Sequence, residues 1–240
     1  MNDRWPQWAR EQLQAAVTLA SSVPAGRPLA VDLYERWFTG AAAPASSTRP
    51  RPLVGEYRRA HEGVATRIVD GLPVLDRHDR LGDDGWWRTW NTSWRPAAGG
   101  ARVLMSAEHD CAALLVGALT SQLRDVPYLL ACPTDASRLA RRGSIVLYLP
   151  RLRVLTPELV GTLATLLRAE TPPLCLPLAP GIAVAQYPDN GMTFGEHRCH
   201  LVALALRDGA QGAALTAIAD VFAAHGVDPA APYRTVRGLA

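Results

Sequence analysis

The hydrophobic and polar positions along the chain change their period near residue 70. Before that point, residues 5–22 and 29–38 place apolar side chains at helical spacing, which predicts two amphipathic helices. Residues 41–53 are small, polar and rich in proline, which predicts a flexible loop or lid. Residues 54–65 then predict a short third helix. The first part of the chain is therefore expected to be helical.

Beyond residue 70, short apolar segments alternate loosely with helical patterns. Strands are predicted over residues 71–75, 85–90, 102–106, 127–132, 144–149 and 182–187, and helices over residues 110–123, 156–168, 193–206 and 211–225, with a short helix ending at residue 142. This order predicts an α+β fold, in which a helical N-terminal part precedes a mixed sheet with packed helices. We expect a single compact unit over residues 1–240, made of N-terminal helices to residue 40, the loop 41–53 and an α+β body over residues 54–240.

Composition narrows the class of protein. The chain has 240 residues, 48% of them hydrophobic, which suits a globular protein. No run of about eighteen apolar residues predicts a membrane span, and the first residues lack the apolar core of a secretion signal, so we expect a cytoplasmic protein. The four cysteines form no CxxC pair, which favours free thiols over a metal or disulfide framework. No cofactor motif is present, and aromatic residues do not interleave with arginines as nucleic-acid binding requires.

The basic residues are unusual. The chain contains no lysine, so all 25 of its lysine-plus-arginine positions are arginine. Arginine grips phosphate or carboxylate with two parallel hydrogen bonds, but it stays protonated and cannot readily accept a proton. Any proton abstraction must therefore use histidine, aspartate, glutamate, tyrosine or cysteine.

Residues 174–206 hold the densest group of polar side chains. A strand over residues 182–187 and a Pro-Asp-Asn-Gly turn precede a helix whose first turns carry Glu196, His197, Arg198 and His200. An arginine near a helix N-terminus is well placed to meet an anion. The alternative is a capped helix with a solvated charged face. The tryptophans of residues 86–94 likewise fit either a packed sheet face or the wall of a groove.

Several motifs, taken in order, resemble the HopA1 effector family. They are LYERWF, GWWRTW, VPYLLACPTD, RRGSIVLYL and the run LAPGIAVAQYPDNGMTFGEHR, and the resemblance spans residues 34–206. Members of this family include plant-pathogen effectors and stand-alone enzymes encoded with class V lanthipeptides and thioamitides. The resemblance implies a cytoplasmic phosphoserine or phosphothreonine lyase without a cofactor. Its partners would be a ribosomal precursor peptide and a separate kinase-like protein that phosphorylates this peptide.

β-Elimination of phosphate needs a base for the Cα proton, positive charge on the leaving phosphate and a donor to the peptide carbonyl. His197 and His61 are the candidate catalytic side chains, with either one as general acid. The candidates for binding phosphate or substrate are Arg141, Arg142, Arg198, Arg102, Arg88 and Tyr57. The alternative for each arginine is a solvated surface charge or a structural ion pair, and for His197 it is a helix-capping or packed histidine.

The sequence departs from the family pattern at Ala131, where the resemblance implies a lysine that acts as the base. Three explanations are open: an engineered substitution, another base such as His61 or Tyr57, or a non-catalytic scaffold that binds the peptide or its kinase. A virulence effector is a further reading. A second departure is Gly143, where the family often carries aspartate.

Overall fold

The fold combines helices with a seven-stranded sheet, so the predicted α+β class is confirmed. The computed structural model describes residues 4–24, 26–40, 52–69, 72–75, 77–95, 100–186, 188, 190–207 and 213–234, the side chains of residues 62–77 excepted. Residues 41–51 of the predicted loop lie outside the described residues. Contacts group the chain into two compact units, Met1–Ala42 with Pro172–Leu176 and Ala185–Ala240, and Ala43–Thr171 with Pro177–Val184. The predicted organisation into one domain stays a prediction.

The first unit is built from helices α1 (Gln7–Ala20), α2 (Leu29–Asp32), α6 (Phe194–Leu206) and α7 (Ala214–Ala224). After α2 the chain continues as a π-helix over Leu33–Phe38, where the sequence predicted one unbroken helix over residues 29–38. Phe38 packs against Phe194, with ring centroids 6.1 Å apart. A Cβ atom on Gly195 would lie only 2.4 Å from the Phe38 ring, so this close approach requires glycine. The motifs LYERWF and FGEHR are thus packing partners.

The sheet has the strand order β3-β4-β6-β7-β5-β9-β8. Its strands are β3 (Arg77–Leu81), β4 (Trp86–Asn91), β5 (Ala101–Met105), β6 (Leu129–Pro133), β7 (Ile145–Leu149), β8 (Leu176–Ala179) and β9 (Ile182–Gln186). The pairs β3–β4, β4–β6, β6–β7 and β5–β7 are antiparallel. Strands β1 (Thr66–Val69) and β2 (Leu72–Leu75) form a separate antiparallel hairpin. Strand β3 is therefore one edge of the larger sheet.

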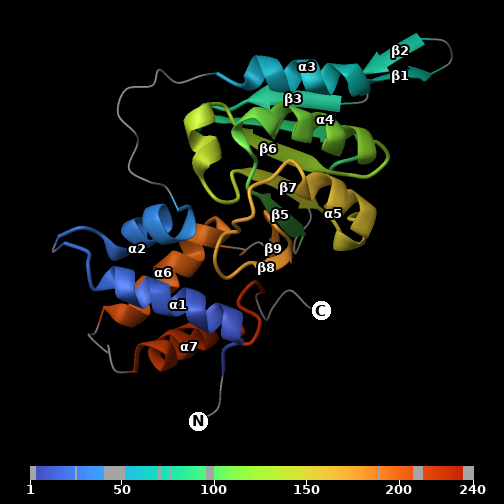
Figure 1. Cartoon of the computed structure of the whole chain (residues 1–240). Helices are drawn as coiled ribbons and strands as arrows, with labels where there is room; N and C mark the ends of the chain where they lie inside the picture. Colours follow the sequence, from blue (N-terminus) through green and yellow to red (C-terminus); the bar gives the residue numbers. More distant parts are fainter. Residues whose placement is uncertain are drawn as a thin grey trace. The chain divides into compact units, whose positions relative to one another are not determined.

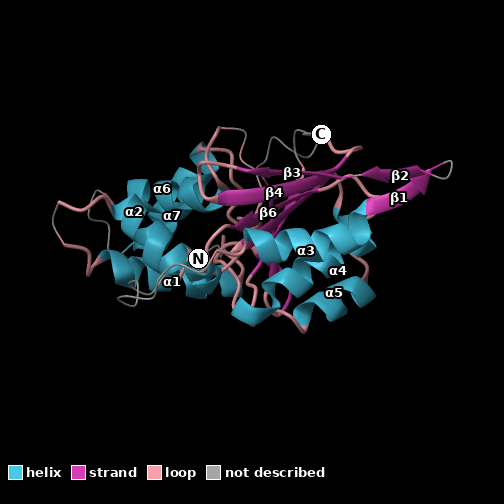
Figure 2. Ribbon diagram, turned by 90° about the horizontal axis from the view of Figure 1, so that it is seen from above, coloured by secondary structure: helices cyan, strands magenta, loops and turns pink. Residues whose placement is uncertain are grey.

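Helices α3 (Val54–Ala65), α4 (Ala112–Gln122) and α5 (Pro157–Ala164) lie on the same side of the sheet, as the view from above makes clear (Figure 1, Figure 2). Apolar side chains from these helices and from alternate strand positions form the core of the second unit. Trp87, Leu130 and Leu147 are fully buried in it. Trp87 therefore belongs to the packed core, which was one of the two interpretations of the tryptophan cluster. We call this side of the sheet the helix face.

Two helix starts follow the predicted capping chemistry. The Thr156 side chain accepts a hydrogen bond from the backbone of Leu159, and proline occupies the first turn of α5. At α6, Thr193 and Glu196 form a reciprocal capping box. Other local predictions were wrong. The short helix ending at residue 142 is a 3-10 turn over Ala136–Ala140. Strand β3 was missed because charged and imidazole side chains dominate it, and β1 and β8 were also missed.

Candidate functional site

The strand register separates the predicted site residues between the two faces of the sheet. Residues directly opposite each other on antiparallel strands point to the same side. Arg80 pairs with Arg88, Arg88 with Ala131, and Ala131 with Val146. A neighbouring row runs from His78 through Trp90, Leu129 and Tyr148 to Arg102. Both rows lie opposite the helix face. We call this surface the arginine face, defined by His78, Arg80, Arg88, Trp90, Arg102, Ala131 and Tyr148.

Two side-chain contacts agree with this assignment of the rows. The Arg102 guanidinium lies over the Tyr148 ring, 4.6 Å from its centroid, in a cation–π contact. At the other end of the row, the His78 and Trp90 rings are 5.9 Å apart between centroids. The arginine face therefore combines cationic, aromatic and imidazole groups on neighbouring strands.

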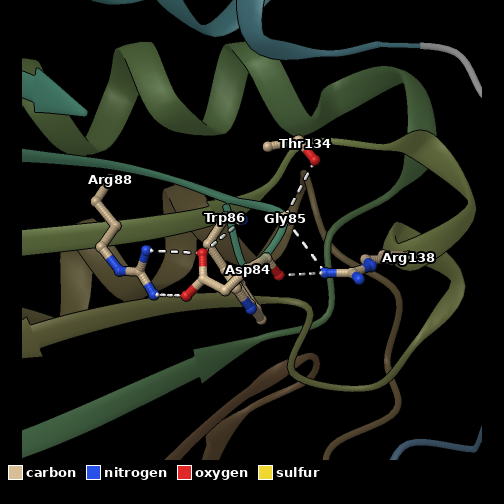
Figure 3. A network of polar contacts seen from close by, with 6 residues as sticks. All are labelled: Asp84, Gly85, Trp86, Arg88, Thr134 and Arg138. Carbon is tan, nitrogen blue, oxygen red and sulfur yellow. Dashed lines mark hydrogen bonds and ion pairs between the residues drawn. The ribbon is translucent and has the colours of Figure 1, made fainter. Parts of the chain in front are cut away.

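A polar network holds the turn between β3 and β4, next to Arg88 (Figure 3). The Arg88 guanidinium donates to both carboxylate oxygens of Asp84, with an Nη1–Oδ1 distance of 3.1 Å. From the other side of the turn, Arg138 donates to the carbonyl oxygens of Asp84 and Gly85. The hydrogen bonds from Arg88 hold the pKa of Asp84 below its ordinary value, and the pKa of Arg88 is raised in return. Both side chains are charged, and Asp84 balances the Arg88 charge.

Ala131 lies on β6 between Arg88 and Val146, and only 3% of its surface is exposed. Because these register partners share a face, a longer side chain at this position would extend over the arginine face beside Arg88. The structure thus brings together three residues that the sequence had singled out separately: Arg88, Arg102 and Ala131.

Tyr57 and His61 lie on the helix face instead. Tyr57 is fully buried and stacks on Trp87, with centroids 5.5 Å apart, and its hydroxyl has no hydrogen-bond partner among the described residues. Burial raises the pKa of the Tyr57 phenol, which opposes its use as a base. His61 Nε2 is 2.8 Å from Thr89 Oγ1. The sheet itself separates both side chains from the arginine face.

Arg141 and Arg142 lie in the loop between the 3-10 turn Ala136–Ala140 and β7. Gly143 follows them with φ of +60°, a left-handed conformation that disfavours most side chains. Its N–H donates to the buried Ser106 Oγ at 2.9 Å, which ties the loop to the end of β5. The glycine at this departure from the family pattern therefore fits the local turn.

His197 and Arg198 belong to the other compact unit. Arg198 is fully buried, and its guanidinium donates to the carbonyl oxygens of Pro232 and Arg234 and to His197 Nδ1. Burial, together with the neighbouring Arg198 charge, lowers the pKa of His197 to about 4. This geometry argues against phosphate binding by Arg198 and against proton donation by His197. Arg198 instead holds the C-terminal segment onto α6.

Sequence reasoning missed four polar residues that lie on or next to the arginine face: His78, Arg80, Tyr148 and Asp84. The available signal was the alternation in residues 77–81, RHDRL, which places His78 and Arg80 on one face and Asp79 on the other. Within the described part of the chain, no cluster of three or more histidine, cysteine, aspartate or glutamate side chains has the arrangement of a metal site. None of the described helices combines the length and apolar composition needed to cross a membrane.

The fold and its arginine face define an α+β protein with a cationic sheet surface. The model of the HopA1 effector protein family matches residues 89–234, which is more than half of the chain. The chain therefore belongs to the HopA1 effector protein family, and the resemblance seen in the sequence motifs is confirmed.

Solved structures show the same fold. The effector protein from Pseudomonas syringae pv. tomato strain DC3000 matches with a TM-score of 0.72 and 15% identity, over 95% of this chain and 98% of its own. The effector protein from Pseudomonas syringae pv. syringae strain 61 matches with a TM-score of 0.67 and 15% identity, over 96% and 98%. A phosphothreonine lyase structure matches with a TM-score of 0.33 and 12% identity, over 75% and 87%, which is too low to carry an argument. No curated protein sequence matches the chain.

Proposed function

We propose that the arginine face binds the phosphate of a phosphoserine or phosphothreonine peptide and eliminates it. One observation carries this proposal: Arg80 and Arg88 lie directly opposite each other on β3 and β4. Like charges at such positions destabilise a strand pair unless an anion compensates them. Asp84 compensates Arg88, whereas Arg80 is exposed and has no ion-pair partner among the described residues. A phosphate dianion placed between the two guanidiniums would pair with Arg80 and compete with Asp84 for Arg88.

The elimination itself needs no redox or group-transfer reagent. A base removes the Cα proton, and the electron pair of that C–H bond forms the Cα=Cβ double bond. The Cβ–O bond breaks at the same time, and phosphate leaves with the bonding electrons. Guanidinium groups at the arginine face would stabilise the negative charge that develops on this leaving group. The product is dehydroalanine from phosphoserine or dehydrobutyrine from phosphothreonine.

The proposal includes the biological setting that the family resemblance implies. The substrate is a ribosomal precursor peptide, a separate kinase-like protein phosphorylates it, and the reaction takes place in the cytoplasm. Arg141 and Arg142 remain candidates for contacts to the peptide. They lie at the end of the sheet where β7 begins, next to the end of β5.

A second candidate function is a scaffold that binds the phosphopeptide or its kinase without chemistry of its own. The observation that favours it is Ala131, because alanine at the position of the expected lysine supplies no base. Binding through the arginine face is common to both candidates, so a measurement of catalysis has to separate them.

Incubation with a synthetic phosphothreonine peptide separates the two functions. Loss of phosphoric acid, detected by mass spectrometry and by phosphate release without any added kinase, would exclude the scaffold. Binding without elimination would exclude the lyase for this chain, and Ala131→Lys would then test whether a lysine at this position restores the reaction. An Arg88→Gln variant serves as the control, because it should reduce both binding and elimination if the arginine face is the site.

A further inference from the structure

We propose that His78 is the base that removes the Cα proton, an assignment that rests on the proposed function. His78 is exposed on β3, on the same face as Arg80 and next to Trp90 of β4. Arg80 is two residues further along the strand, and the two side chains therefore point to the same side. If the phosphate lies between Arg80 and Arg88, the Cα atom of the same substrate residue would come close to the row that contains His78 and Trp90.

No other histidine of the sheet-containing unit lies on the described arginine face. His61 is buried on the helix face, and His109 lies in the 3-10 turn His109–Cys111. The remaining three, His197, His200 and His225, belong to the other compact unit. His78 is thus the one imidazole on the described arginine face.

The backbone at His78 is held from the helix face by two consecutive hydrogen bonds. Thr89 Oγ1 donates to the His78 carbonyl oxygen at 2.9 Å. The Thr89 hydroxyl has a single proton and uses it toward the His78 carbonyl. At its 2.8 Å contact with His61 the hydroxyl oxygen must therefore accept a hydrogen bond, so His61 carries its proton on Nε2 and donates it. His61 and Thr89 act here as positioning residues for the edge strand.

Asp79, the next residue of β3, is held by side-chain hydrogen bonds. Asp79 Oδ2 accepts hydrogen bonds from Trp87 Nε1 and Arg58 Nε, both at 2.8 Å. Burial acts to raise the pKa of Asp79, but these two bonds and the Arg58 charge hold it below its ordinary value. An edge strand usually frays more readily than a central one. Here two hydrogen-bond networks, of which the His61–Thr89 contact is buried, hold β3 in register and present the His78 ring to the arginine face.

The chemistry also points to an imidazole. The chain has no lysine, and a guanidinium does not accept protons. The carboxylate nearest to Arg88, that of Asp84, is engaged by that guanidinium. The neutral imidazole of His78 would take the Cα proton while the Cβ–O bond breaks, and the resulting imidazolium would return this proton to solvent or to the departing phosphate.

The experiment compares His78→Ala and His78→Gln with His200→Ala, a matched change at an exposed histidine of α6. Elimination from the phosphothreonine peptide should fall by about 100-fold or more in both His78 variants, the scale of general-base catalysis, and stay unchanged in His200→Ala. Phosphopeptide affinity, measured by fluorescence anisotropy, should change less than about twofold, because binding rests on the arginines. Added imidazole should restore elimination in His78→Ala only, since an exposed site admits it.

Each outcome separates this assignment from the proposed function. Normal elimination by the His78 variants, or a loss of activity matched by an equal loss of phosphopeptide affinity, overturns His78 as the base and leaves the lyase intact. If the unmodified protein binds the phosphopeptide and releases no phosphate, the lyase proposal itself fails and the base assignment fails with it. Circular dichroism of His78→Gln shows that the variant is folded before its rate is interpreted.

Discussion

The contact between Arg88 and Asp84 provides the sharpest test of the arginine face. Arg88→Gln removes one of the two guanidiniums that lie opposite each other, while Asp84→Asn keeps the guanidinium and removes its carboxylate partner. The side chains of Arg88 and Asp84 are 34% and 51% exposed, so water screens their mutual attraction. Such a pair contributes about 0.2–1 kcal/mol to stability. Both variants should therefore remain folded.

The two changes should move phosphopeptide affinity in opposite directions. A charge-assisted hydrogen bond to phosphate is worth about 1.5–3 kcal/mol, so Arg88→Gln should raise Kd by about 10- to 150-fold. Asp84→Asn frees the guanidinium from a competitor worth about 0.2–1 kcal/mol, so Kd should fall by about 1.4- to 5-fold. The affinity of the unphosphorylated peptide should hardly change in either variant.

Fluorescence anisotropy with a labelled phosphothreonine peptide measures both effects, and the unphosphorylated peptide is the reference. Arg207→Gln, at an exposed position just after α6, controls for the loss of one positive charge from the protein. If Asp84→Asn weakened binding as much as Arg88→Gln, the pair would serve only to hold the β3–β4 turn. Equal losses for the two peptides would likewise show that Arg88 does not recognise phosphate.

Three further predictions concern the fold. Gly195→Ala should cost about 1–3 kcal/mol by overpacking, whereas Gly161→Ala, whose new Cβ meets nothing within 4 Å, should gain up to about 1 kcal/mol; urea denaturation of both variants tests this. A disulfide-exchange thiol reagent should modify Cys111 alone in the folded protein and all four thiols in urea, because the other three are buried and burial raises their pKa. Burial lowers the pKa of His197 to about 4, so near pH 6.5 the unfolded chain binds this proton and the folded chain does not. The free energy of unfolding should therefore fall by about 1–3 kcal/mol between pH 6.5 and pH 4. His197→Gln should flatten this pH dependence, as measured by urea denaturation at several pH values. If the stability of His197→Gln depended on pH as steeply as that of the unchanged protein, the lowered pKa of His197 would not be the cause.

The sequence predicted the element types well where one pattern was strong. The helices over residues 110–123 and 156–168 and the strand over residues 144–149 were confirmed, although α5 ends at Ala164, about one helical turn before its predicted end. They are long or continuously apolar, so local preference and burial agree. Strand β3 was missed, because four of its five residues are charged or imidazole side chains and its identity depends on pairing with β4.

For the candidate site, too, the sequence identified some residues that the structure places on the arginine face and others that it places elsewhere. Residue types singled out Arg88 and Arg102, since arginine is suited to phosphate, and the family resemblance singled out Ala131 as the position of an expected lysine. They also singled out His61 and Tyr57, which lie buried on the opposite face, and Arg198, whose guanidinium is used inside the first unit. The composition could not distinguish these cases, because burial and facing direction depend on which strands become neighbours.

By itself, the sequence determined the α+β class, the family and the kind of chemistry available: many guanidiniums, no lysine and six imidazoles. Only the tertiary structure decided which of these groups share a surface. Residues 78, 80, 88, 102, 131 and 148 come from five strands, and the antiparallel register places them on one face. The physical reason is the two-residue period of a strand, since a shift of one residue in any of these pairings would send its side chains to the opposite face.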